Sequence, residues 1–222
     1  MNAQTAEQDG TTADPSRRSV FAPFSHGTFR ALWIATLISN FGGMIHVVGA
    51  GWVMTTMTDS YNMVALVQGA TTLPIMAFSI AAGALADNSD RRRIMILAQS
   101  GMALVSTLFA VLSISGLLTP WSLLALTFLI GSGTALFNPS WHASVGDVVP
   151  REDLPSAVSL NSVGFNLTRS VGPALGGAVV ALGGSATAFV LNALSYIPLI
   201  VALVRWHPPP GDSLPRERFG TA

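Results

Sequence analysis

The fold is decided by one long apolar stretch, IMILAQSGMALVSTLFAVLSISGLLTPWSLLALTFLIGSGTALFNPSWHASVG, which occupies residues 94–146 and contains no charged side chain. About 20 apolar residues in a helix cross the hydrocarbon core of a bilayer, so this stretch has room for two spans. Thr119-Pro120 interrupts it near the middle and predicts the turn between them. A helix on the surface of a soluble core would carry a polar stripe, and this stretch has none. We therefore expect membrane-spanning helices.

The rest of the chain repeats this pattern on either side. Residues 31–57 and 60–86 carry no charge, and residues 154–204 carry a single one, on Arg169. The expected fold is therefore an all-α membrane protein with six transmembrane helices, at residues 29–57, 63–86, 94–118, 121–145, 154–182 and 185–206. The polar residues 1–28 are expected to form an N-terminal tail, and residues 207–222 a tail or the start of a linker.

Composition narrows the possible functions. Hydrophobic residues make up 50% of the chain and charged residues 10%, with a net charge of zero, so nothing predicts a nucleic-acid partner. There is no cysteine, which excludes disulfides and thiol chemistry. The sequence has no nucleotide-binding loop, zinc-protease pattern or serine-hydrolase pattern. We therefore expect neither an enzyme nor a bound cofactor or metal.

The arginines predict the orientation. All eleven basic residues are arginine, and all except Arg169 fall on one side of the predicted membrane: Arg17, Arg18, Arg30, Arg91, Arg92, Arg93, Arg151, Arg205, Arg216 and Arg218. Loops rich in arginine and lysine face the cytoplasm in multi-pass proteins. We expect both termini to be cytoplasmic and the protein to lie in the inner or plasma membrane.

A charged motif, GALADNSDRRR, occupies residues 83–93 between the second and third predicted helices. Gly83 allows a neighbouring helix to approach closely. Asp87, at a helix end, can pair with a helix N-terminus or a guanidinium group. The simpler alternative is a solvated loop whose arginines set only the orientation.

A second motif, Gly172-Pro173-Ala174-Leu175-Gly176-Gly177, lies within the fifth predicted helix. Gly172 and Gly176 form a G-x-x-x-G pair that permits close helix packing. Pro173 removes a backbone donor and can bend the helix. Ordinary packing within a membrane protein is the alternative explanation.

Together, the two motifs resemble signatures of the major facilitator superfamily. Gly83, Leu85, Asp87, Arg91 and Arg92 match the first signature, whereas Asn88 and Asp90 depart from it, and aspartate at position 90 is similar to the siderophore and macrolide exporter branch. The second motif resembles the antiporter signature of helix five.

The resemblance implies a particular architecture and function. The chain would be the N-terminal half of a twelve-helix transporter, built as two inverted three-helix repeats, and would export a small drug-like or siderophore-like molecule by alternating access, driven by an ion gradient. It also implies two working parts: a conformational latch of Gly83, Asp87, Asp90, Arg91 and Arg92, and a helix-five hinge of Gly172, Pro173, Gly176 and Gly177.

Arg169 is the main candidate for a binding residue, because it lies about midway along the fifth predicted helix. A guanidinium at that depth costs about 2.5–3.5 kcal/mol on insertion scales. No aspartate or glutamate lies deep in any predicted helix, so its partner must be an amide, a carbonyl, water, a substrate anion or a group on another chain. We expect it to line a substrate or ion cavity with Asn40, His46, Asn138 and Asn166. A structural lock for Arg169 and a neutral, hydrogen-bonded role for His46 are the alternatives.

Half of a transporter cannot enclose a cavity alone. The expected partners are therefore the lipid bilayer, a small-molecule substrate and a second six-helix half, which could be a missing C-terminal half, a separate chain or a second copy. The competing hypothesis is a half-length remnant that does not transport and packs against another membrane protein as an assembly subunit.

Overall fold

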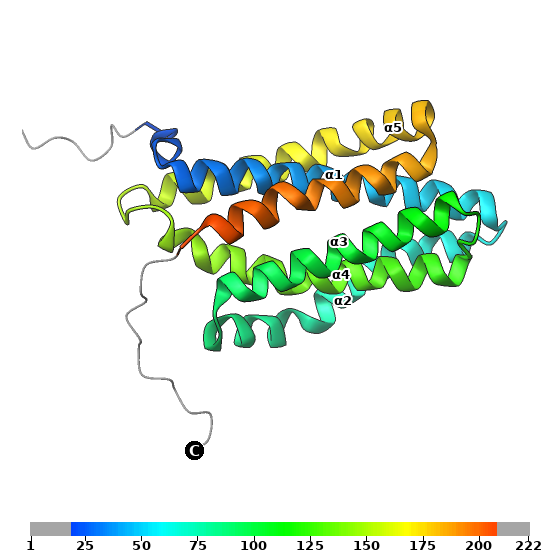
Figure 1. Cartoon of the computed structure of the whole chain (residues 1–222), viewed down its shortest axis with the longest axis horizontal. Helices are drawn as coiled ribbons and strands as arrows, with labels where there is room; N and C mark the ends of the chain where they lie inside the picture. The colour runs from blue at the N-terminus through cyan, green and yellow to red at the C-terminus, as the bar shows by residue number, and fades with distance from the viewer. Residues whose placement is uncertain (1–18, 208–222) are drawn as a thin grey trace, which may run out of the picture.

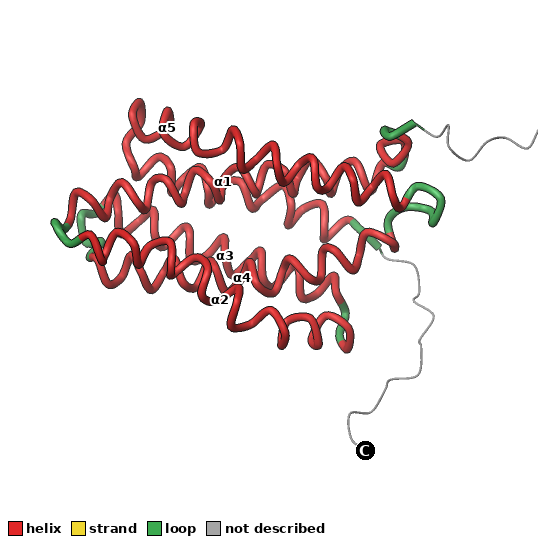
Figure 2. Tube along the Cα trace, turned by 180° about the vertical axis from the view of Figure 1, so that it is seen from behind, coloured by secondary structure: helices red, strands yellow, loops and turns green. Residues whose placement is uncertain are grey.

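A computed structural model describes residues 19–207, apart from the side chains of residues 79–81 and 84–88. The described residues form helices and contain no strand, which confirms the all-α prediction. The elements are η2 (Ala22–Ser25), α1 (Gly27–Met57), α2 (Tyr61–Asn88), α3 (Arg91–Ile114), α4 (Pro120–Ser144), η3 (Val145–Asp147) and α5 (Leu154–Arg205), as Figures 1 and 2 show.

The longest element, α5, reverses its direction at Gly184. This glycine has φ 77° and ψ 168°, a backbone conformation that residues with a side chain rarely adopt. The two arms of α5, residues 154–183 and 185–205, therefore run in opposite directions (Figure 1). The reversal falls at the Gly183-Gly184 pair, where the sequence predicts the break between its last two helices.

The third helix ends earlier than its apolar composition predicts. The prediction placed its end at Leu118, but α3 ends at Ile114, so that boundary is wrong. Gly116 adopts φ 69°, and the amides of Leu117 and Leu118 donate to the carbonyl of Leu112 at 3.0 and 3.1 Å. These bonds close the helix by a C-terminal glycine turn. Hydropathy continues through such a turn and cannot locate it.

Length and composition fit a multi-pass membrane protein. Within the described residues, four helical segments are long and apolar enough to cross a bilayer: Gly27–Met57, Arg91–Ile114, Pro120–Asp147 and Leu154–Arg205. The last has 52 residues in its two arms, more than twice the length that one span needs. The 28 residues of α2 extend over about 42 Å, enough to cross a hydrocarbon core of about 30 Å.

Successive helices alternate in direction, so both ends of the described chain lie at the same end of the bundle (Figure 1). This end also holds the starts of α1, α3 and α5 and the last residue of α5. It therefore collects the described arginines other than Arg169, namely Arg30, Arg91, Arg92, Arg93, Arg151 and Arg205. We call it the arginine-rich end.

Glycines bring α1 and the first arm of α5 into close parallel contact. A methyl group placed on Gly172 would lie 2.6 Å from Cβ of Met44, and one on Gly176 would lie 2.9 Å from Cβ of Val48. Nearer the arginine-rich end, Gly164 lies against Trp33 and Leu37. The indole of Trp33 donates to the carbonyl of Leu160 at 3.2 Å. The G-x-x-x-G pair therefore packs against α1.

The second arm of α5 packs on another side of α1 and on α3. Gly42 and Gly49 of α1 lie against Ser195 and Ala188. Between α3 and α5, Asn192 donates to the hydroxyl of Ser106 at 3.0 Å, and this hydroxyl donates to the carbonyl of Phe189 at 3.3 Å. These buried bonds fix the register between the two helices, because unpaired polar groups are costly in an apolar interior.

The same kind of contact joins α2 and α4. A methyl group on Gly131 of α4 would lie 2.7 Å from the carbonyl oxygen of Thr71 and 2.7 Å from Cγ of Pro74, both in α2. Beside it, Gly133 lies against Met102 of α3. Small residues in α4 thus admit two neighbouring helices, as small residues commonly do in membrane bundles.

We predict that Gly172→Ala lowers the stability of the bundle. The added methyl group must displace Met44, and overpacking of this kind costs about 1–3 kcal/mol. Gly177→Ala is the matched control, because Gly177 has no neighbour within 4 Å of its added methyl group and the same gain in helix propensity applies. Thermal unfolding of the purified protein in detergent measures both. Equal melting temperatures for the two variants would contradict the packing described here.

Candidate functional site

The first arm of α5 exposes two stripes of opposite character. Ser162, Asn166 and Arg169 follow one another at i, i+4 and i+7 and are exposed. Val163, Leu167 and Val171 form the other stripe and are also exposed. Residues three, four and seven apart share one face of a helix, so the polar and apolar side chains point in different directions. The apolar stripe suits lipid, whereas the polar stripe needs water or another polar surface.

Arg169 is the last residue of the polar stripe and lies midway along the first arm of α5. It is about 22 Å from either end of its arm, at 1.5 Å per residue. Its guanidinium carbon lies 5.5 Å from the ring centroid of Phe165, a cation–π contact. No hydrogen bond or ion pair of Arg169 occurs within residues 19–207, where side chains are described. Moreover, residue 173 is proline and has no amide hydrogen to bond the carbonyl of Arg169 one turn earlier.

The exposed sides of α1 also differ from each other. Ile34, Ile38 and Trp52 form an exposed apolar side. On another side, Asn40 and Gly43 are partly exposed, and no atom lies within 4 Å of a methyl group placed on Gly43. At this depth the second side therefore carries a polar and a small residue, and it leaves open space beside Gly43.

The packing register puts Asn40 at the same depth as Arg169. Gly164 meets Leu37 and Gly172 meets Met44, so Arg169, between the two glycines, is level with residues between Leu37 and Met44. The polar residues in that interval are Ser39, which is buried, and Asn40, which is partly exposed.

Helix geometry also puts Asn40 and Arg169 on the same side of the α1–α5 pair. Viewed from the N-terminus, each residue of an α-helix lies about 100° clockwise of the one before. Asn40 then lies about 50° anticlockwise of the α1 row that touches α5, and Arg169 about 80° clockwise of the α5 row that touches α1. The contact rows of two parallel helices face each other and so point in opposite directions. An anticlockwise turn from one row and a clockwise turn from the other therefore lead to the same side of the pair. We call Asn40, Gly43, Ser162, Asn166 and Arg169 the polar face.

Asn138 lies elsewhere. Its side chain is exposed on α4, but it is six residues from the end of the helix at Ser144, about 9 Å at 1.5 Å per residue. It is thus much nearer to the arginine-rich end than Arg169. The structure therefore brings Asn40, Asn166 and Arg169 to one depth but leaves Asn138 at another.

His46 lies inside the bundle and not on the polar face. Its side chain is 1% exposed, and its ring lies 4.8 Å from the ring of Phe109 and 5.3 Å from that of Phe189, measured between centroids. Neither ring nitrogen has a hydrogen-bond partner among the described residues. Its neighbours Gly42 and Gly49 contact the second arm of α5, so His46 points toward that arm and away from the first arm, which carries Arg169.

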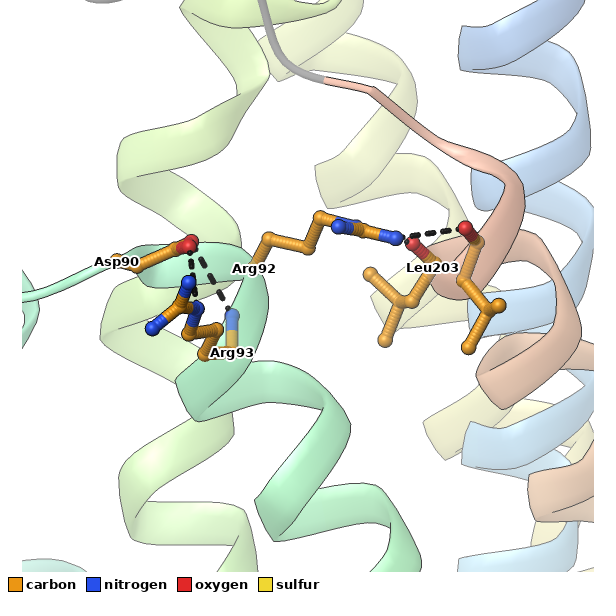
Figure 3. A network of polar contacts seen from close by, with 5 residues as sticks. Asp90, Arg92, Arg93 and Leu203 are labelled. Atoms are coloured by element: carbon orange, nitrogen blue, oxygen red, sulfur yellow. Dashed lines mark hydrogen bonds and ion pairs between the residues drawn. The ribbon is translucent and has the colours of Figure 1, made fainter.

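The charged motif connects helix ends at the arginine-rich end. Asp90 caps α3: its carboxylate accepts from the amide of Arg93 at 3.3 Å and pairs with the guanidinium of Arg93 at 3.1 Å. Arg92 donates to the carbonyls of Leu203 and Val204 at 2.8 and 2.6 Å, as Figure 3 shows for Leu203. The arginines at the start of α3 therefore contact different partners: Arg93 contacts its own helix start, and Arg92 contacts the end of α5.

Arg91 makes the third connection. It donates to the carbonyl of Ala143 at 3.0 Å and lies 3.5 Å from the carboxylate of Asp147. Ala143 belongs to the last turn of α4, as Leu203 and Val204 belong to the last turn of α5. The last carbonyls of a helix lack partners within it and carry partial negative charge, so the two guanidinium groups complete and stabilise these ends.

The remaining two residues of the predicted latch are Asp87 and Gly83. The side chain of Asp87 lies outside the described residues. Gly83 is partly exposed, and a methyl group on it would meet nothing within 4 Å.

One contact at this end has no pattern in the sequence that predicts it. His26 and Asp153 lie 2.9 Å apart and join the start of α1 to the start of α5.

Membrane-spanning helices, glycine-mediated packing and an arginine midway along one arm are features of a multi-pass membrane protein. Comparison with protein families is specific: residues 18–222 match the model of the transmembrane secretion effector family, and the chain belongs to this family of the major facilitator superfamily. The family resemblance read from the two motifs is thereby confirmed, and the relatives below are transporters or efflux proteins, not enzymes.

Three relatives illustrate the family. The chain is 28% identical over 167 residues to the staphyloferrin A transporter of Staphylococcus aureus, covering 75% of this chain and 42% of that protein. It is 25% identical over 177 residues to the multidrug efflux pump Tap of Mycobacterium tuberculosis, covering 76% and 42%. It is 23% identical over 176 residues to macrolide efflux protein A of Streptococcus pyogenes, covering 79% and 42%. The chain thus spans about two fifths of the length of these relatives.

We predict that Arg92→Gln loosens the end of α5. The carbonyls of Leu203 and Val204 lose a charged donor, so amide hydrogen exchange across the last two turns of α5 should quicken at least several-fold. Arg93→Gln is the control, because the side chain of Arg93 is 81% exposed and contacts only its own helix start. Exchange followed by mass spectrometry in detergent measures the effect. Unchanged exchange at the end of α5 in Arg92→Gln would argue against this bridge.

Proposed function

We propose that this chain is one half of an exporter that moves a small drug-like or siderophore-like molecule across the inner or plasma membrane by alternating access, driven by an ion gradient. The observation that carries this proposal is the polar face, which sets a charged guanidinium at mid-membrane depth on a side of the bundle that is not apolar. Intramembrane charges of this kind usually mark a substrate or ion pathway. The relatives, a multidrug efflux pump, a macrolide efflux protein and a staphyloferrin A transporter, agree with it.

The helix contacts support a two-repeat construction. If α1, α2 and α3 form one repeat, and α4 and the two arms of α5 form the other, the contact of α1 with the first arm of α5 is the counterpart of the contact of α4 with α2. Glycines mediate both, at Gly172 and at Gly131, and the second helix of each repeat contains a proline, Pro74 or Pro173. The contacts of α4 with α3 and of α1 with the second arm correspond in the same way.

We propose that a second six-helix unit covers the polar face and closes the substrate cavity. The relatives are more than twice as long as the matched part of this chain, which leaves room for such a unit in each of them. Residues 207–222 would then lead toward it as a linker, and the arginine-rich end, with both termini of this half, would face the cytoplasm. Asn138 would line the cavity nearer to the cytoplasmic side.

We further propose that the motif at residues 83–93 is the conformational latch. Arg91 and Arg92 hold α3 against the ends of α4 and α5, so movement at this loop would be transmitted to both helices. Gly83, Asp87 and Asp90 would complete the latch toward the second unit. In the first arm of α5, Gly172 and Gly176 anchor the arm to α1. Bending would occur at Pro173, which is exposed, and at Gly177, where an added methyl group would meet nothing within 4 Å.

Proton-coupled export can be tested in proteoliposomes that contain the full natural protein carrying this chain. With an imposed proton gradient, addition of ethidium, erythromycin or citrate should in at least one case start a proton flux through the protein, which a pH-sensitive dye reports. A protonophore, which dissipates the gradient, should abolish this signal. Empty liposomes are the control. Proton release with none of the three, from protein that remains folded, would contradict proton-coupled export and favour the assembly-subunit alternative.

A further inference from the structure

We infer that the polar face binds an anionic group, a carboxylate in the first instance, of the transported molecule, and that Arg169 selects for it. This inference rests on the proposed function and names its substrate class. The site consists of the guanidinium of Arg169 with the amides of Asn40 and Asn166 at the same depth, one on each of two parallel helices.

Charge balance is the first argument. The described acidic residues are Asp59, Asp90, Asp147, Glu152 and Asp153, and each lies at or beyond the end of a helix. Arg169 is about 22 Å from the ends of its arm. No described carboxylate can therefore reach it, so any anion that pairs with Arg169 must come from outside this bundle. A transported anion is such a group.

The donor set is the second argument. A guanidinium presents five N–H donors in a planar fork that matches the two oxygens of a carboxylate. Asn166 lies on the same stripe one turn away, and Asn40 lies across the α1–α5 contact at the same level, so both amides can add donors. Phe165 occupies one side of the guanidinium, with its ring centroid 5.5 Å from the guanidinium carbon. An aromatic face there steadies the cation and leaves its N–H edges free.

Access is the third argument. Gly43 of α1 has open space beside it, and Ser162 and Asn166 are exposed, so the polar face has room for a ligand group in front of Arg169.

A second copy of this chain would bring another Arg169, not a carboxylate, to such a surface. A symmetric pair would thus place two cations near one cavity and strengthen its preference for anions.

The test compares two probes of the same shape, 1-naphthoate and uncharged 1-naphthamide, binding to the full natural protein in lipid nanodiscs. We expect naphthoate to bind about 10- to 100-fold more tightly, the range for hydrogen bonds to a charged group. Arg169→Gln should abolish this preference, and Arg169→Lys, which keeps the charge, should retain much of it. Asn40→Ala should reduce it in part. Arg93→Gln, an exposed arginine at the helix end, should leave it unchanged.

Two results would overturn the inference: equal binding of the two probes, or a preference for naphthoate that survives Arg169→Gln. If Arg169→Gln lowers the melting temperature but leaves probe preference intact, Arg169 pairs permanently with a carboxylate of the second unit and does not select substrate. Proton-coupled transport by a protein that binds the two probes equally would preserve the proposed function while rejecting this site. A naphthoate preference without proton-coupled transport would do the reverse.

Discussion

The close parallel contact of α1 with the first arm of α5 is the constraint on which the candidate site depends. Gly164, Gly172 and Gly176 remove the side chains that would hold the two helices apart, and Trp33 bonds to the backbone across the contact. This contact sets the relative depth of the two helices. It also fixes their rotation, so that the side of α1 with Asn40 and the side of α5 with Arg169 turn the same way. A slip of one residue would rotate either helix by about 100° and separate them.

The arginines of this chain illustrate how the same side chain is used in three environments. Arg92 and Arg91 complete the ends of two helices, where unpaired carbonyls offer partners. Arg93 pairs with Asp90 near solvent and contributes little to stability. Arg169 has neither kind of partner among the described residues, and its depth makes hydration costly. Its environment, not its residue type, identifies it as the candidate for binding.

Much of the fold was predictable from the sequence, and much of the site was not. Uncharged stretches located the helices, and Gly183-Gly184 located the reversal in α5. Hydropathy placed the end of the third helix at Leu118, however, because a turn at Gly116 is formed by backbone bonds that leave no hydropathy signal. Likewise, His46 and Asn40 are polar residues six positions apart on one helix, and only the packing showed that one is buried among phenylalanines and the other borders the open side.

The candidate site requires the polar face to line a water-accessible cavity and not to meet lipid. The chain has no cysteine, so single cysteines can be introduced without a background signal. Ser162, on the polar stripe, and Val163, on the apolar stripe, are adjacent in the same arm, and each can be replaced by cysteine. Their labelling by a charged, membrane-impermeant thiol reagent, measured in native membranes, tests this requirement most directly. A water-accessible polar face predicts rapid labelling at position 162 and little at position 163. Equal labelling, or faster labelling at position 163, would contradict such a face.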